Sequence, residues 1–229
     1  MKDKWITKVT LAIAAFCIMP AVAFAESDTQ LFKNWSYGQH IDSIPSDQGY
    51  YDCSEDFDGL VLCKDDVIFL EYSFQEQLIF NDAKMLSQVA VVTEFTFDRF
   101  ATVLGALVRS FKTVYAEGSN ETFDIIKNLH QGTYADPQNL MVAIDTFAKE
   151  QLYQGYLNLF MISDSEVASS KNATSLQDLL RDFPNDGRVV DVYVYENDWG
   201  SWLDATFYFP GKIRERMMDQ AEEAPTEDF

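Results

Sequence analysis

Two cysteines around an acidic loop are the first residues in the sequence that could do chemistry. Residues 54–65 place hydroxyl or acidic side chains at the first, third, fifth and twelfth positions of a calcium-binding loop, with glycine at the sixth. However, the first position carries Ser54 instead of Asp, the twelfth carries Asp65 instead of Glu, and the flanking segments have strand patterns. We therefore expect a solvated acidic turn, and we assign no metal and no cofactor.

Cys53 and Cys63 are the only cysteines that follow the N-terminal apolar segment. In an oxidising compartment a pair this close forms a disulfide, which stabilises the fold by roughly 2.5–3 kcal/mol in the chain-entropy model. A two-cysteine metal site is the alternative, but it needs further ligands, and the sequence holds only two histidines, His40 and His130. The spacing predicts a disulfide.

The nucleophiles and acids form no catalytic signature. The sequence has no Gly-x-Ser-x-Gly elbow, and a serine triad would have to use His40 or His130. Two carboxylates could hydrolyse a glycan, but this chemistry needs one acid with a raised pKa near an ionised one. Acids are too numerous for any pair to be singled out. We assign no catalytic residue, and an envelope-polymer hydrolase that uses paired carboxylates remains the alternative to a binding protein.

Aromatic side chains crowd one predicted hairpin near the C-terminus. Tyr193, Tyr195, Trp199 and Trp202 lie in it, with Trp199 in the turn. Alternating aromatic residues can line an exposed strand face, where they give contact area at low entropic cost. Packing into the core is the more usual role of such residues, and it applies to all of them except Trp199. These four residues are the candidate interaction surface.

Alternating apolar residues predict three antiparallel hairpins, which would position these side chains. They lie at about 59–74, 78–95 and 188–209, with the first turn in residues 64–66 and the second in residues 81–84. Their β-branched residues suit a pleated surface. Whether the third hairpin joins the first sheet or forms a second one stays open.

Two segments change to the helical period of 3.6 residues. Seven apolar residues spaced by three or four predict a helix over about 97–116, with Thr96 as its N-cap. Asp136 before Pro137 predicts the start of a helix over about 137–153. Together with the hairpins, these helices predict an α+β fold in which amphipathic helices pack an antiparallel sheet.

The N-terminus has the features of an export signal. Residues 1–25 combine three lysines with an apolar run and end in Ala-Phe-Ala, so we expect cleavage before Glu26. A membrane anchor is the alternative, but the run is short for a span of about 20 residues. We expect residues 26–220 to form one exported domain, with a candidate internal boundary at 163–174, and residues 221–229 to form a disordered acidic tail.

The charge of the chain narrows the classes of partner. Cleavage would remove three of 17 basic and one of 37 acidic residues, leaving 14 and 36 and a net charge of −22. Such a surface repels nucleic acid and anionic lipid and steers a cationic partner towards it. We therefore expect a periplasmic or secreted non-catalytic protein that engages a cationic protein or peptide, for example as an inhibitor. A module that binds a small ligand is a further alternative.

Overall fold

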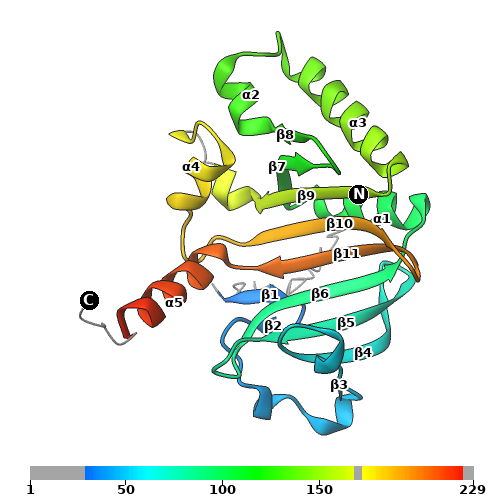
Figure 1. Ribbon diagram of the computed structural model, residues 1–229, viewed down its shortest axis with the longest axis vertical. Coiled ribbons are helices and arrows are strands. Elements are labelled where there is room, and N and C mark those ends of the chain that lie inside the picture. The colour runs from blue at the N-terminus through cyan, green and yellow to red at the C-terminus, as the bar shows by residue number, and fades with distance from the viewer. Residues whose placement is uncertain (1–28, 168–171, 224–229) are drawn as a thin grey trace, which may run out of the picture.

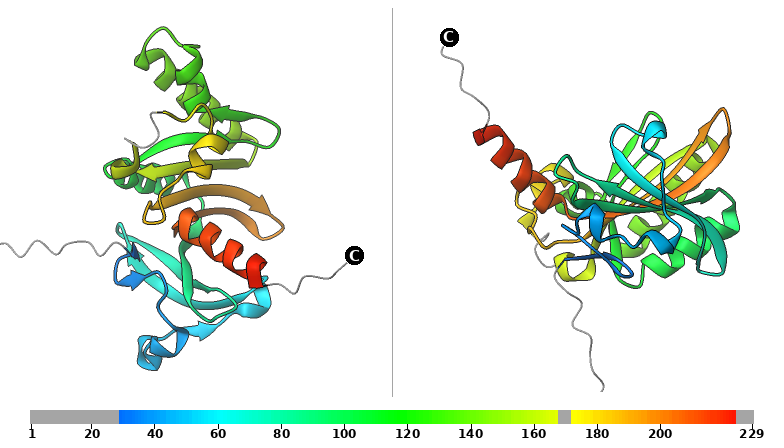
Figure 2. Two further views of the ribbon diagram at one scale, coloured as in Figure 1. Left: turned by 90° about the vertical axis from the view of Figure 1, so that its left-hand side faces the viewer. Right: turned by 90° about the horizontal axis from the view of Figure 1, so that it is seen from below.

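A strongly twisted, nine-stranded antiparallel sheet forms the body of the protein (Figures 1 and 2). The computed structural model describes residues 29–167 and 172–223. From one edge to the other the strands run β3-β4-β5-β6-β11-β10-β9-β7-β8. The hairpin nearest the C-terminus therefore lies at the centre of the same sheet as the earlier hairpins. Residues 1–25 lie outside the described part, so the export signal stays a prediction.

Two short strands come first along the chain, and the antiparallel strands of the first half of the sheet follow. The second half of the chain contains both helices and strands. The strands are β1 (Gln30–Phe32), β2 (Trp35–Ser36), β3 (Tyr51–Asp52), β4 (Leu60–Phe69), β5 (Tyr72–Phe80), β6 (Leu86–Glu94), β7 (Phe111–Glu117), β8 (Thr122–Asp124), β9 (Tyr156–Ser163), β10 (Val189–Asn197) and β11 (Gly200–Tyr208). The α-helices are α1 (Phe97–Leu107), α2 (Ile125–Gln131), α3 (Pro137–Tyr153), α4 (Leu176–Arg181) and α5 (Pro210–Glu223). Short 3-10 turns occupy Ile41–Ser43, Ser46–Gln48, Ser54–Asp56 and Asp164–Val167.

The predicted α+β fold and its antiparallel hairpins are confirmed, but the first turn lies later than expected. Strand β4 continues through residues 64–66, where the register with β5 shifts and Asp66 adopts a positive φ of 55°. The chain instead reverses at Leu70 and Glu71, between the paired residues Phe69 and Tyr72. The polar run Lys-Asp-Asp is thus a bulge in a long strand, because a bulge accommodates an irregular residue without ending the pairing.

The first predicted helix is correct at its start and too long at its end. The Thr96 side chain accepts a hydrogen bond from the backbone N–H of Arg99, as expected of an N-cap, but α1 ends at Leu107. Residues 111–117 form β7, which pairs with β9, so the predicted end at 116 is wrong. Phe111 and Tyr115 have helical spacing by coincidence, and aromatic and β-branched residues in this segment suit a strand.

The second predicted helix of the chain is confirmed, and a further helix follows the last strand. Helix α3 has the predicted bounds, and the Asp136 side chain caps it by accepting from the N–H of Asn139. Helix α5 projects from the body (Figure 1) and runs through residues 221–223 of the segment that we expected to be disordered. Residues 224–229 lie outside the described part of the chain.

One face of the sheet carries the main hydrophobic core. Alternate residues of the central strands, including Val192 and Leu203, point to this face and are fully buried. Helix α1 packs there through Phe100 and Val103, and the β1–β2 pair adds Phe32. The two faces of a strand alternate strictly, so the residues between these apolar ones must lie on the opposite face.

That opposite face carries two smaller apolar clusters. One lies on β4 and β5, where Val61 and Ile79 pack with the two cysteines. The other lies towards β9 and β7. There α4 contributes Leu179 to a second cluster that includes Phe160 of β9 and Val189 of β10. Because Phe160 is paired with Asp191, this cluster and Asp191 lie on the same face of the sheet.

Between the two clusters, this face is mostly polar and aromatic on β11, β10 and β9, whereas β6 adds Ala90 and Val92 beside Gln88. We call this middle part the polar face.

The turn between β4 and β5 gives a test of the fold. Glu71 is exposed and has a φ of 70°, a left-handed conformation that costs an L-residue roughly 1–2 kcal/mol. Glycine adopts this conformation freely, although it loses more entropy on folding. We expect Glu71→Gly to raise the free energy of unfolding by about 0.5–1 kcal/mol in urea denaturation.

A matched control is Glu150→Gly, because Glu150 is exposed in the interior of α3. This change should lower the free energy of unfolding by about 1 kcal/mol. Equal destabilisation by both substitutions would contradict the positive φ at Glu71.

Candidate functional site

A row of side chains crosses the centre of the polar face. Tyr193 of β10 pairs with Asn158 of β9 on one side and with Asp204 of β11 on the other. Glu117 of β7 pairs with Asn158 and extends the row by one more strand. Asp191 lies two residues from Tyr193 on the same strand and is therefore a diagonal neighbour of both Asn158 and Asp204. The register thus brings two carboxyl groups and an amide together.

Except for Glu117, these residues line a hollow of about 420 Å³ in the polar face. Three of the eight lining residues are tyrosines. The Tyr193 ring contacts Tyr156 edge-on at 5.1 Å and stacks on Tyr195, outside the lining, at 4.9 Å between ring centroids. The lining residues are Gln88, Tyr156, Asn158, Asp191, Tyr193, Asp204, Thr206 and Tyr208. The hollow therefore combines aromatic surface with acidic and amide oxygens.

Hydroxyl groups hold the two carboxyl groups in place. The Tyr208 hydroxyl donates to Asp191 Oδ2 at 2.8 Å, and the Thr206 hydroxyl donates to Asp204 Oδ1 at 2.7 Å. Tyr208 also packs against the cluster beneath α4, which fixes its ring. One oxygen of each carboxyl group is thus occupied by a neighbouring hydroxyl.

Burial makes both carboxyl groups weaker acids than usual. Loss of hydration raises the pKa of Asp191 to about 6, with a further rise from the charge of Glu117 and an opposing effect of the Tyr208 hydroxyl. Burial likewise raises the pKa of Asp204 to about 6, and the charge of Asp191 adds to that rise. At pH 7 and above, both groups are mainly ionised in a place that disfavours their charge.

The tyrosines around the pair stay protonated at neutral pH. Burial raises the pKa of Tyr156 to about 12, helped by a hydrogen bond with Tyr193. Burial, followed by the charge and the hydrogen bond of Asp191, raises the pKa of Tyr208 well above its usual value. These side chains therefore offer hydroxyl donors and neutral ring faces.

Two oxygens in the hollow have no hydrogen-bond partner. Asn158 Oδ1 and Asp191 Oδ1 each expose less than 1 Å² and accept no hydrogen bond from the described residues. An unpaired buried acceptor costs roughly 1–3 kcal/mol. A donor brought to these two atoms would recover that free energy.

The hollow lacks a positive charge of its own. Its lining includes no lysine, arginine or histidine. The charged groups that shift the pKa values of Asp191 and Asp204 are both acidic, Glu117 and Asp191 itself. Buried charges in proteins are normally paired. The arrangement is therefore suited to hold a cation that another molecule supplies.

The structure brings together three of the four predicted surface residues. Tyr193, Tyr195 and Trp202 lie on the polar face, since Tyr195 pairs with Trp202, and none of the three is fully buried. Trp202 donates to Asn197 Oδ1 at 3.1 Å near the hairpin end. Trp199 lies at the tip of the hairpin, is 86% exposed, and lies outside the hollow.

Sequence reasoning missed both carboxyl groups of the hollow. The alternation Asp191, Tyr193, Tyr195 on β10 and Trp202, Asp204, Thr206 on β11 places each acid on the same face as the aromatic residues. That signal was present in the sequence. The pairing of β9 with β10, which adds Asn158, could not be read from it.

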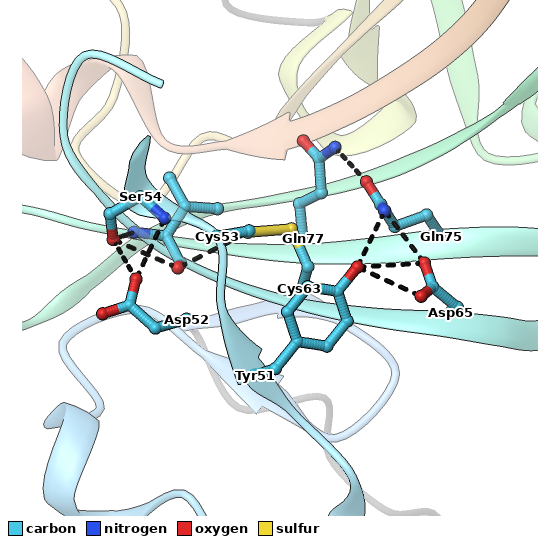
Figure 3. Close-up of a disulfide and its surroundings, with 9 residues drawn as sticks. Tyr51, Asp52, Cys53, Ser54, Cys63, Asp65, Gln75 and Gln77 are labelled. Atoms are coloured by element: carbon cyan, nitrogen blue, oxygen red, sulfur yellow. Dashed lines mark hydrogen bonds between the residues drawn. A yellow bond between two sulfur atoms is a disulfide. The ribbon is translucent and has the colours of Figure 1, made fainter. Parts of the chain in front are cut away.

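The acidic loop forms a separate, structural region at the sheet edge (Figure 3). Cys53 and Cys63 form the predicted disulfide, with an S–S distance of 2.01 Å. Asp52 accepts from the N–H and the hydroxyl of Ser54, and Gln75 donates to Asp65 at 2.9 Å, so these groups bond within the loop and to β5 (Figure 3). Among the described residues, no group of three or more His, Cys, Asp or Glu side chains could hold a metal ion.

The raised pKa values predict how stability depends on pH. The folded protein binds protons at Asp191 and Asp204 more tightly than the unfolded chain does, so these groups favour folding increasingly as the pH falls from about 7 towards 4. Between pH 7.5 and pH 5, each carboxyl group should add about 1 kcal/mol to the free energy of unfolding.

The double substitution Asp191→Asn/Asp204→Asn should remove this contribution and stabilise the protein at pH 7.5, because the amide carries no buried charge. Urea denaturation of both proteins at the two pH values measures it. The same pH dependence in both proteins would show that the two groups titrate normally.

Comparison with protein-family models, with curated proteins and with solved structures finds no match. Within residues 29–167 and 172–223, no helix is both long and apolar enough to cross a membrane. A functional hypothesis therefore has to come from the polar face itself.

Proposed function

We propose that the protein is an exported binding protein whose polar face engages a cationic protein or peptide. One observation carries the proposal: Asp191 and Asp204 lie largely buried in one hollow that has no basic side chain in its lining. A cation from a partner would supply the missing counter-charge. Export follows from the predicted signal and is supported by the disulfide, because disulfides persist in oxidising compartments.

The energetic argument rests on the burial of like charges. Two ionised carboxyl groups that are diagonal neighbours repel each other, and their weak hydration leaves that repulsion poorly screened. A cation placed between them is attracted by both carboxylates, and these two attractions outweigh the repulsion between the carboxylates. Binding should therefore be stronger here than at an exposed acidic patch, where water already screens the charges.

The tyrosine walls add a second source of affinity. The rings of Tyr156 and Tyr193, which line the hollow, attract a cation through their quadrupoles, and this effect grows when the cation is desolvated. Rings also bury the aliphatic part of a basic side chain. The hollow therefore suits an organic cation better than a small hydrated ion.

The surroundings of the hollow favour a macromolecular partner. Tyr195 and Trp202 continue the polar face towards the hairpin tip, where Trp199 projects into solvent. Aromatic residues of this kind are enriched in protein interfaces. The net charge of −22 expected after cleavage would steer a basic protein towards this surface.

Hydrolysis of an envelope polymer is a second candidate, because the structure does bring two carboxyl groups together. An acid–base pair normally has its two pKa values pushed apart, so that one group is protonated while the other is ionised. Here burial raises both pKa values to about 6. This similarity favours binding over catalysis. Release of soluble fragments from peptidoglycan by the wild-type protein, and not by Asp191→Asn, would establish the hydrolase instead.

Titration with a basic peptide tests the binding proposal. The probe is a hexapeptide of alternating lysine and arginine, measured by isothermal calorimetry at pH 7.5 in 50 mM salt. We expect the double variant Asp191→Asn/Asp204→Asn to bind at least ten times more weakly than the wild-type protein, because it lacks both buried charges.

The control is Glu121→Gln/Glu150→Gln, which removes two exposed charges away from the hollow and gives the same net charge. It should lower affinity by less than threefold. Equal weakening by the two double variants would mean that the peptide senses only the overall charge, and the proposed site would be refuted.

A further inference from the structure

We propose that the hollow recognises the ammonium group of a lysine side chain on the partner and discriminates against arginine. This inference rests on the proposed function and specifies the chemical group that the partner presents. It follows from how the acceptor oxygens are distributed over three strands and from which of them are already occupied.

The acceptors come from three neighbouring strands. Asn158 comes from β9, Asp191 from β10 and Asp204 from β11. Tyr193 lies between Asn158 and Asp204 in one row, and Asp191, two residues away on the same strand, is a diagonal neighbour of both. A lysine ammonium has three N–H donors that diverge from one nitrogen, and this number and divergence match three separate acceptors.

A guanidinium group needs a different arrangement. Arginine binds a carboxylate best through two parallel hydrogen bonds to both of its oxygens. In the hollow, Tyr208 already donates to Asp191 Oδ2, and Thr206 already donates to Asp204 Oδ1. A paired interaction with either carboxylate would have to share an oxygen that already accepts from Tyr208 or Thr206, so arginine would gain less from its preferred geometry than at a carboxylate without such donors.

Two oxygens without a hydrogen-bond partner also support recognition of an ammonium group. Asn158 Oδ1 and Asp191 Oδ1 are the two side-chain atoms of the described residues that are buried without any hydrogen-bond partner, and both belong to this hollow. An ammonium group would satisfy both with charge-assisted hydrogen bonds. Because both atoms are covered, the ligand must displace the side chains above them as it enters.

A metal ion fits these acceptors less well. Calcium takes six to eight oxygen ligands, whereas the described residues contain no group of three or more acidic, histidine or cysteine side chains arranged for a metal. The tyrosine rings around Asp191 instead provide apolar surface, which can pack against the four methylene groups of lysine.

Three capped pentapeptides test this inference by isothermal calorimetry at pH 7.5. Each has two glycines on both sides of a central residue, which is lysine, arginine or trimethyl-lysine. We expect the lysine peptide to bind at least ten times more tightly than the arginine peptide. The trimethyl-lysine peptide should also bind at least ten times more weakly, because it keeps the charge and loses all three donors.

Substitution of Asn158 tests the geometry independently of net charge. Asn158→Leu removes the neutral acceptor and should weaken binding of the lysine peptide about tenfold, while changing the affinity for the arginine peptide less than twofold. The control is Gln138→Leu, which removes an exposed neutral amide on α3, outside the lining, and should leave lysine affinity within twofold of wild type.

The outcomes separate this inference from the proposed function. Equal binding of the lysine and arginine peptides, or equal binding of trimethyl-lysine, would overturn lysine recognition while leaving a cation-binding site in place. Failure of all three pentapeptides would also overturn it. If the alternating hexapeptide fails as well, the proposed function falls with it. Competition of added calcium with the lysine peptide would assign the acceptors to a metal.

Discussion

Strict alternation of side chains along β10 and β11 is the constraint on which the rest of the structure depends. These two strands lie at the centre of the sheet, so the apolar residues that they turn towards α1 are the middle of the main core. Val192 and Leu203 are fully buried there. A shift of register by one residue would bury Asp191 and Asp204 in that core. The residues that build the core therefore also fix the two acids on the opposite face.

The same arrangement explains why the acids lie in a costly position. The cluster beneath α4 covers one end of the polar face, and the tyrosines enclose the carboxyl groups beside it. Burial without a counter-charge opposes folding at neutral pH, as the raised pKa values of both groups show. Binding sites often carry such a cost, because the interactions that a partner completes are left incomplete in the protein alone.

Local patterns predicted the fold well wherever a segment determines its own structure. The cap at Asp136 and the helical period gave α3 its observed bounds, and alternation gave the hairpin that contains Tyr193. Pairing between distant segments was less predictable. Phe111 and Tyr115 suggested that α1 continued, but pairing with β9 makes this segment a strand. The turn at Leu70 and Glu71 was missed because neither residue is typical of positive φ.

In the candidate site too, local patterns predicted part of the arrangement, and pairing between distant segments determined the rest. Alternation placed Tyr193, Tyr195 and Trp202 on one face, and it also held the information for Asp191 and Asp204. The abundance of acids hid that pair, because composition alone gives no reason to choose two among so many. Asn158 joins the site only through the pairing of β9 with β10, which is a property of the folded sheet.

The central claim is that Asp191 and Asp204 form a largely buried pair of carboxyl groups whose counter-charge is a cation from a partner. Carbon-13 NMR of the side-chain carboxyl carbons, followed from pH 3 to pH 8 with and without the lysine pentapeptide, tests it most directly. The account predicts two carboxyl groups that titrate near pH 6 in the free protein and below pH 5 with saturating peptide. Two aspartates that titrate near pH 4 and do not respond to the peptide would contradict it.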